Sequence, residues 1–394
     1  MRFEVDRLTM LEAAKNVAKI APTSSPVEIL NRILVESNDN TGEIYMTATN
    51  REVSIQQKVV GSIGESGAVL VNPRLLIGMM SLLEGEVVTF SADRPEKLKV
   101  VGGKCTYHIN CLPSNGYPKP IMPFPEESVL LTGICSIAKR TIFAVSKDKS
   151  KPALQCVNVK LKNSAVHATA TDGMRMMLVK DSTQPTEEQE FLLPGRSLEV
   201  LASISSDSDV FEVSDIGNEI VFVRGDMIFT INKLTTGSYM DTTAVVKSIK
   251  SAYVAVANAS DIKEALDLIA ISALAGSTKK PINLILTSDE IVLKCNNDTS
   301  ESSTVVPAII SQGTAKAGFF YDVSALIKLF QVVAGKVRIE IDAKGFMLIK
   351  TRSEVYLQAP MHPPKKKKSP VKAAAKSTKE VESAKGAEGV KEVA

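Results

Sequence analysis

The stretch EIYMTATN, residues 43–50, occurs three times in this chain in related form. Residues 165–172 read AVHATATD and residues 290–297 read EIVLKCNN. Each copy alternates like a half-buried β-strand and ends on a residue that favours turns. The closing residues, 122 and 125 positions apart, are Asn50, Asp172 and Asn297. Because solenoid repeats span only about 20–50 residues, this spacing indicates three copies of a whole domain.

Helical stretches repeat with the same period. Leucine-rich segments with helical spacing follow each copy, at about 73–83, 196–205 and 322–334. An earlier helix is expected in each module, from the N-cap Asp6 to about Ala21, at 134–147 and at 259–272. Turn residues join the intervening strand patterns directly, which favours antiparallel sheets. The sequence therefore predicts an α+β fold, with each module ordered strand, helix, strands, helix, strands.

We place the modules at residues 1–124, 125–246 and 247–362. The first boundary lies within the Pro- and Gly-rich stretch 114–126, which is typical of a linker. A chain of 394 residues suits three domains of about 120 residues. Residues 363–394 are rich in lysine and alanine and show no apolar period, so we expect a disordered tail.

The net charge of +3 is unevenly distributed. Residues 365–394 hold nine lysines and four glutamates, so residues 1–364 carry a net charge of −2. A faintly acidic body does not bind nucleic acid over its whole surface. If the body contacts DNA, its basic groups must gather on one face.

Composition also limits compartment and redox state. The five cysteines are scattered, odd in number and free of any C-x-x-C pair, so we interpret them as reduced packing residues. No apolar run approaches the ~18 residues that a membrane helix needs. Residues 1–9 show no signal-peptide pattern. We expect a cytoplasmic protein, associated with the nucleoid, that has no membrane partner.

Catalytic and cofactor motifs are absent from the sequence. We find no P-loop, no G-x-S-x-G, no H-E-x-x-H and no dinucleotide fingerprint. His167 is interpreted as a half-exposed strand residue, and Asp172-Gly173 as a turn. A hydrolase using His167 and Asp172 is the weakest alternative, because nothing supplies nucleophile, base and orienting group together. We expect no catalytic residue, no cofactor and no metal.

The predicted helices carry many cations outside their apolar stripes. Any single one is more simply a solvated residue, but a repeated basic face could line one concave surface. Such a surface would hold phosphates without reading bases. Aromatic residues for stacking are scarce there, which favours duplex over single strands. The candidate DNA-facing residues are Lys15, Lys19, Arg74, Lys139, Arg140, Lys147, Arg196, Lys263 and Lys328.

Four segments resemble one protein family. They are TATNREVSI at 47–55, TATDGMRMM at 169–177, FLLPGRSLEVL at 191–201 and YLQAPM at 356–361. Through them the chain resembles the bacterial sliding clamp, the β subunit of DNA polymerase III, over residues 1 to about 362. The resemblance implies a head-to-tail homodimer whose six modules encircle double-stranded DNA, with helices lining the hole. It also implies a processivity factor for the replicative DNA polymerase, with a clamp loader as a further partner.

The resemblance implies two sets of contact residues. Tyr107 and Ile109 would form the dimer interface with Ile271 of module 3. An apolar cleft between modules 2 and 3 would dock linear motifs of partner proteins. Its residues would be Leu154, Thr171, Gly173, Met174, Arg175, Met176, Met240, Val245, Leu357, Pro360 and Met361.

Several positions depart from the family pattern. Met174 stands where histidine is usual, Met240 where proline is common and Asp322 where asparagine is frequent, so motif preference stays open. Pro152 and Ala153 stand where some members have aromatic residues near DNA, and Ser24 stands where others have an arginine. We expect Lys147, Lys149 and Lys151, which lie nearby in the sequence, to compensate.

The lysine-rich tail is an addition to the family pattern. Its lysines Lys365–Lys368, Lys372 and Lys376 either add non-specific affinity for DNA or partners or serve only to keep the protein in solution. The alternative function is an architectural DNA-binding protein acting through that tail. A clamp leaves circular DNA when the circle is cut, whereas a tail-driven binder does not.

Overall fold

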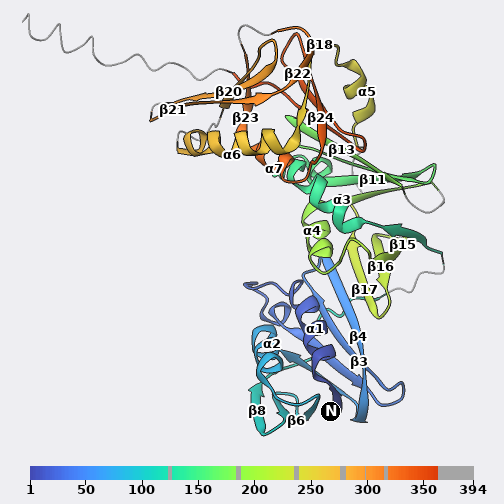
Figure 1. Cartoon of the computed structure of the whole chain (residues 1–394). Helices are drawn as coiled ribbons and strands as arrows, with labels where there is room; N and C mark the ends of the chain where they lie inside the picture. The colour runs from blue at the N-terminus through green and yellow to red at the C-terminus, as the bar shows by residue number, and fades with distance from the viewer. Residues whose placement is uncertain are drawn as a thin grey trace, which may run out of the picture.

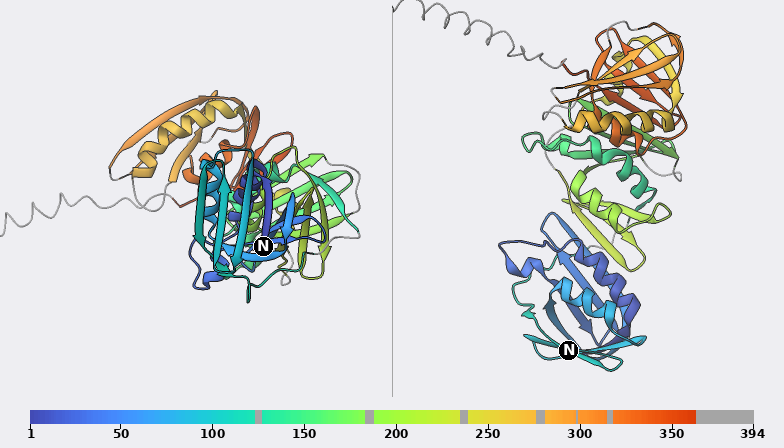
Figure 2. Two further views of the ribbon diagram at one scale, coloured as in Figure 1. Left: turned by 90° about the horizontal axis from the view of Figure 1, so that it is seen from below. Right: turned by 60° about the vertical axis from the view of Figure 1, so that its left-hand side comes forward.

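Three modules with the same order of elements follow one another along a curved stack (Figure 1). The computed structural model describes residues 1–122, 127–182, 188–234, 239–275, 281–297, 299–314 and 318–362. The right-hand view in Figure 2 shows the modules one after another, with module 1 at the end that carries the N-terminus. The tail predicted at 363–394 lies outside the described residues.

Module 1 begins with β1 (Arg2–Asp6), whose residues alternate between exposed and buried. Asp6 then caps α1 (Arg7–Ala18), because its carboxylate accepts the N–H of Thr9 at 2.7 Å. Helix α1 packs against α2 (Pro73–Leu82), which Asn72 caps. The other strands are β2 (Ile33–Asn38), β3 (Glu43–Thr49), β4 (Val53–Glu65), β5 (Gly67–Val71), β6 (Val87–Arg94), β7 (Lys97–Gly102), β8 (Cys105–Asn110) and β9 (Leu112–Pro113).

Module 2 begins with β10 (Val129–Thr132) and α3 (Ile134–Thr141). The helix predicted over 134–147 is shorter, because the β-branched pair Thr141-Ile142 favours helix weakly and the chain is extended by Val145. Two 3₁₀ turns follow, Ile142–Ala144 and Pro152–Gln155. The remaining elements are β11 (Cys156–Lys162), β12 (Ala165–Thr171), β13 (Arg175–Ser182), β14 (Gln189–Pro194), α4 (Gly195–Ser203), β15 (Val210–Ile216), β16 (Glu219–Arg224) and β17 (Met227–Asn232).

A helix that the sequence reading missed, α5 (Thr242–Ser248), connects modules 2 and 3. Its N-cap is Asp241, and the boundary predicted at residue 246 falls inside it. Module 3 contains β18 (Ser251–Asn258), α6 (Ala259–Ala275), β19 (Pro281–Leu286), β20 (Glu290–Asn296), β21 (Glu301–Pro307), β22 (Ile309–Gln312), β23 (Phe319–Asp322), α7 (Val323–Phe330), β24 (Lys336–Asp342), β25 (Met347–Lys350) and β26 (Glu354–Gln358).

The three repeated segments fold alike. Asn50 Oδ1 accepts the backbone N–H groups two and three residues ahead at 2.9 and 2.8 Å. Asp172 Oδ1 does the same at 2.9 Å for both, and so does Asn297 Oδ1. The β-strand and the turn-forming residue predicted for each copy are therefore confirmed.

Two antiparallel sheets cross the module boundaries. Strand β17 of module 2 pairs with β4 of module 1, with Phe229 opposite Ile55. Strand β13 of module 2 pairs with β26 of module 3, with Met177 opposite Tyr356. A 13-stranded sheet thus spans modules 1 and 2, and a nine-stranded sheet spans modules 2 and 3. Strands β21, β20, β19 and β23 form a separate four-stranded sheet in module 3.

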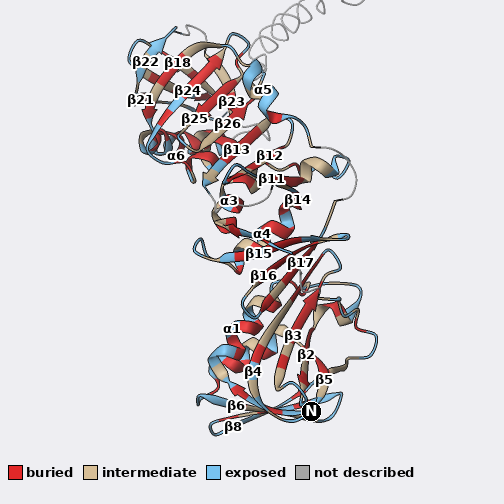
Figure 3. Ribbon diagram, turned by 90° about the vertical axis from the view of Figure 1, so that its right-hand side faces the viewer, coloured by how far each residue is buried: buried red, intermediate tan, exposed pale blue. Residues whose placement is uncertain are grey.

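Helices and sheets occupy opposite sides of the stack. In Figure 1, α1, α2, α3, α4, α6 and α7 lie toward the concave side of the curve, and most strands lie behind them to the right, with β20 and β21 above α6 and with β6 and β8 below α2. Figure 3 shows buried residues concentrated on the strands and helices that face each other within a module. Phe3 and Phe90, for example, stack at 4.8 Å in the core of module 1. Among the described residues, no helix is long and apolar enough to cross a membrane.

Candidate functional site

A cleft of about 420 Å³ lies at the boundary between modules 2 and 3. One wall is the β12–β13 turn of module 2, and the others are α5, the β24–β25 hairpin and β26. The lining residues are Thr171, Gly173, Met174, Arg175, Met176, Met240, Val245, Ser248, Ile249, Asp342, Lys344, Phe346, Leu357 and Ala359.

The floor of the cleft is apolar. Met176 and Leu357 are buried there and belong to one cluster with Val245 and Phe346. At the mouth, Met174 is 57% exposed and Met240 is 42% exposed. Methionine side chains are unbranched and adapt to irregular partners, so this lining suits apolar segments of more than one shape.

The structure brings eight of the predicted cleft residues together and leaves three outside the lining. Leu154 lies in a 3₁₀ turn, and its carbonyl accepts from Ser146. Pro360 lies near Gly345, and the Met361 N–H donates to the carbonyl of Phe320 at 2.7 Å. The lining residues that sequence reasoning missed as cleft residues are Ser248, Ile249, Asp342, Lys344, Phe346 and Ala359. The capping Asp241 was the one sequence signal for α5, and therefore for Ser248 and Ile249.

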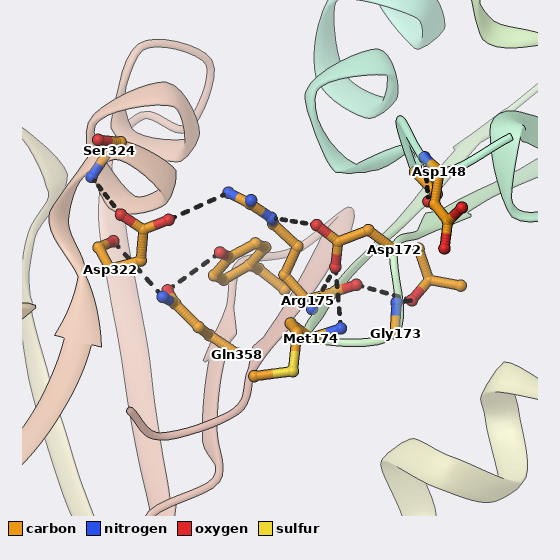
Figure 4. Close-up of polar contacts among 11 residues, drawn as sticks. Asp148, Asp172, Gly173, Met174, Arg175, Asp322, Ser324 and Gln358 are labelled. Carbon is orange, nitrogen blue, oxygen red and sulfur yellow. Dashed lines mark hydrogen bonds and ion pairs between the residues drawn. The ribbon is translucent and has the colours of Figure 1, made fainter. Parts of the chain in front are cut away.

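Arg175 connects the two modules at the edge of the cleft (Figure 4). Its Nε donates to Asp172 Oδ2 at 2.8 Å within module 2. Its Nη1 lies 3.8 Å from Asp322 Oδ2, at the start of α7 in module 3. Burial alone would lower the pKa of this guanidinium, but the hydrogen bond and charge of Asp172 outweigh burial and raise it. The arginine is therefore firmly charged.

The alternative catalytic pair has no supporting geometry. His167 is half-buried on β12, where burial and the nearby Lys180 and Lys162 lower its pKa. Asp172 is engaged by the hydrogen bonds of its own turn and by Arg175. Over the described part of the chain, no three potential metal ligands come together.

Most of the candidate DNA-facing cations are exposed side chains. Lys15, Lys19, Arg74, Lys147, Lys149, Arg196, Lys263 and Lys328 are exposed, as is Lys139, whose Nζ lies 3.6 Å from Asp207. Arg140 differs, because its side chain is 12% exposed and ion-paired with Asp181 and Glu354. Helix α3 turns Arg140 toward β13 and β26, so its charge links modules 2 and 3. The interpretation of Arg140 as a DNA-facing cation was therefore wrong.

Each end of the stack exposes an open strand edge beside apolar side chains. Strand β8, which carries Tyr107 and Ile109, ends the 13-stranded sheet, and β21 ends the four-stranded sheet. Beside β8, α2 exposes Leu75 and Leu82 by 50% and 77%. In module 3, α6 exposes Ile271 by 75%, flanked by Leu268 and Leu274.

Comparison with known proteins gives consistent matches. Residues 1–122 match the model of the DNA polymerase III beta subunit N-terminal domain, and residues 132–241 match that of its central domain. The chain is 24% identical to the beta sliding clamp of Staphylococcus epidermidis over 359 residues, covering 88% of this chain and 89% of that protein.

Solved structures share the fold. A putative DNA polymerase III beta subunit from Eubacterium rectale superposes with a TM-score of 0.85 at 18% identity, covering 92% of this chain and all of that one. The DNA polymerase sliding clamp of Bacillus subtilis gives 0.83 at 20% identity, with the same coverage. The two domain models describe successive parts of one subunit and together match more than half of the residues. The chain therefore belongs to the family of the DNA polymerase III beta subunit, the bacterial beta sliding clamps.

Proposed function

We propose that two copies of this chain close head to tail into a ring around double-stranded DNA and tether the replicative DNA polymerase to it. The observation that carries this proposal is a repeated rule of strand pairing. At both internal boundaries, the third strand after the second repeated helix of one module pairs with the fourth strand of the module before it: β17 pairs with β4, and β26 pairs with β13. Strand β8 in module 1 is the equivalent of β17 and β26, and β21 in module 3 is the equivalent of β4 and β13. Neither β8 nor β21 has such a partner among the described residues.

The strand pairs at the two internal boundaries predict the register of the junction between two copies, where β8 of one chain would pair with β21 of the other. Tyr107 of β8 stands 122 residues before Phe229, and Ser302 of β21 stands 247 residues after Ile55, following the repeat of the turns. Since Phe229 lies opposite Ile55, Tyr107 would lie opposite the partner's Ser302. Cys105, two residues earlier, would lie opposite the partner's Thr304. Two such junctions related by a twofold axis close a ring of six modules.

Helix packing supports the same closure. At the internal boundaries, the helix positions equivalent to Leu75 are Ser197 and Ala325, and both are buried. Leu75 is 50% exposed because module 1 has no neighbour on that side in a single chain. Helix α6 of a second copy, with Ile271 exposed on it, would cover this surface. Burial of large apolar side chains then favours the pairing.

The side of the stack that carries the helices would become the lining of the ring. Exposed cations on α1, α2 and α4, among them Lys15, Arg74 and Arg196, would face the phosphates. Contacts of this kind give affinity without sequence preference, so the ring could slide. Helix α6 carries Lys263 beside acidic residues, so the positive lining would be strongest in modules 1 and 2.

The cleft between modules 2 and 3 would dock partners on the outside of the ring. Its apolar floor and its two exposed methionines fit short linear segments carrying apolar side chains. The replicative polymerase and a clamp loader would both use it. The clamp would therefore work in the cytoplasm, on the DNA of the nucleoid, as a binding scaffold without chemistry of its own.

A disulfide trap tests the ring and its register. Cys105 is the one exposed cysteine of the five, so Thr304→Cys adds a single new partner for it. Opposed residues of an antiparallel pair have Cα atoms about 4.5–5.5 Å apart, within disulfide range. We expect oxidation to give a covalent dimer with Thr304→Cys and little with Ser303→Cys, the matched control next to it. Equal cross-linking of both variants, or of neither, would contradict the proposed pairing.

The same trap separates the clamp from a tail-driven DNA binder. The Thr304→Cys variant is oxidised in the presence of closed circular plasmid. The plasmid is then washed at high salt, which removes protein that is bound only by electrostatic attraction. A clamp stays on the circle and is released when a restriction enzyme cuts the plasmid. Loss in the wash would favour the architectural alternative.

A further inference from the structure

Asp322 is in contact with the cleft wall without lining the cleft. It is the last residue of β23 and the N-cap of α7, because its Oδ1 accepts the N–H of Ser324 at 3.0 Å. Its other carboxylate oxygen lies 3.8 Å from the Arg175 guanidinium. Its carbonyl accepts from Gln358 of β26 at 3.4 Å, so the residue is fixed within module 3 (Figure 4).

Arg175 is held from the other side by the turn that forms the cleft wall. Its backbone N–H and its Nε both donate to Asp172, at 2.9 and 2.8 Å. Gly173 adopts a positive φ of 90° in this turn, and its N–H donates to Thr171 Oγ1 at 3.1 Å. The guanidinium therefore joins the turn in module 2 to the first turn of α7 in module 3.

The other two repeats lack this link. The turn position of Arg175 is Val53 in module 1 and Ser300 in module 3, and neither carries a charge. The N-caps of the equivalent helices are Asn72 and Pro194, which are also uncharged. A chain of carboxylate, guanidinium and carboxylate occurs at the one boundary that has the apolar cleft, so folding of the repeat does not require it.

We propose that Asp322 is a positioning residue for the cleft: through Arg175 it holds the wall formed by residues 172–176 in the shape that accepts a partner segment. The inference rests on the proposed docking function. Without the Asp322 charge, the guanidinium is no longer held to module 3, and the wall samples other shapes. A ligand must then order the wall when it binds, which lowers affinity without removing any direct interaction.

The chain offers a matched pair of substitutions. Asp322→Asn removes the charge but keeps an N-cap side chain, because asparagine caps helices as well as aspartate does. Asp241→Asn makes the same change at the N-cap of α5, which borders the cleft but holds no cation among the described residues. The two variants therefore differ in whether the charge that is removed faced Arg175.

The test measures binding of a fluorescein-labelled Ser-Leu-Ser-Leu-Phe peptide, chosen for its apolar side chains, by fluorescence anisotropy. We expect Asp322→Asn to weaken binding about threefold, the size of a partly exposed ion pair, and Asp241→Asn to leave it unchanged. In an Arg175→Gln background, Asp322→Asn should have no further effect, because the link is already absent. A purely structural loss at α7 would weaken binding equally in both backgrounds.

Amide hydrogen exchange gives a readout that needs no peptide. We expect the N–H groups of residues 173–175 to exchange several times faster in Asp322→Asn than in the wild type or in Asp241→Asn. Unchanged hydrogen exchange together with unchanged peptide affinity would overturn the proposed role of Asp322 and would leave the docking function standing. A wild-type chain that binds no peptide would overturn the docking function and this inference with it.

Discussion

Shortening Ile271 should weaken the dimer about a thousandfold. The side chain is 75% exposed in the single chain and lies on the face of α6 that we expect to meet the partner's α2. Burying most of such a side chain stabilises an interface by about 2 kcal/mol. Because the ring contains the junction twice, Ile271→Ala removes about 4 kcal/mol, which corresponds to about 10³ in Kd.

Sedimentation equilibrium over a wide concentration range measures this change directly. Ile309→Ala is the matched control, since Ile309 is 70% exposed in the same module but lies on β22, which pairs with β18 away from the open edge of β21. It should dimerise like the wild type. A Kd for Ile271→Ala within threefold of the wild-type value, or equal losses in both variants, would refute the proposed junction.

Three further outcomes follow from the described contacts. Glu340 is nearly buried; burial opposes its ionised form, but hydrogen bonds from Lys350, Arg338 and Ser251 outweigh burial and lower its pKa from 4.5 to about 2. The ionised Glu340 carboxylate therefore contributes its full stabilisation of the folded state above about pH 4.5, and this contribution is lost as the pH falls toward 2. The difference in urea midpoint between the wild type and Glu340→Gln should shrink over that range. Arg140→Met leaves two carboxylates facing each other and should lower the free energy of unfolding by about 2–3 kcal/mol in urea melts. Arg196→Gln should reduce the slope of log Kd against log salt concentration by about one unit if its guanidinium binds one phosphate, measured by DNA titration at several salt concentrations.

The local elements were predictable because their signals are local. Asp6 precedes an apolar stripe and caps α1 as expected, and the Asx residues that close the repeated strands make the same turn three times. The period of about 122 residues was visible because equivalent strands in the three modules keep the same apolar alternation. These features depend on interactions within a few residues of each other.

The contacts between modules could not be predicted in this way. The far wall of the cleft comes from Asp342, Lys344 and Phe346, about 170 residues beyond the β12–β13 turn. No repeat or period in the sequence links them to Met176. Arg140 looked like another basic residue on a helix. Only the packing of α3 against β13, which pairs with β26, shows that Asp181 and Glu354 are its two carboxylate partners. Resemblance to the family located the near wall, which consists of contiguous motif residues.

The main-chain hydrogen bonds that run through both internal boundaries have a mechanical consequence. The pairs β4–β17 and β13–β26 are joined by backbone hydrogen bonds like any other neighbouring strands. Bending a single chain at a module boundary would therefore break inter-strand hydrogen bonds in the interior of a sheet. Each protomer should then behave as a rigid arc. Any force that opens the ring to admit DNA would act at the two junctions between chains, and separating one junction would leave the fold of both protomers unchanged.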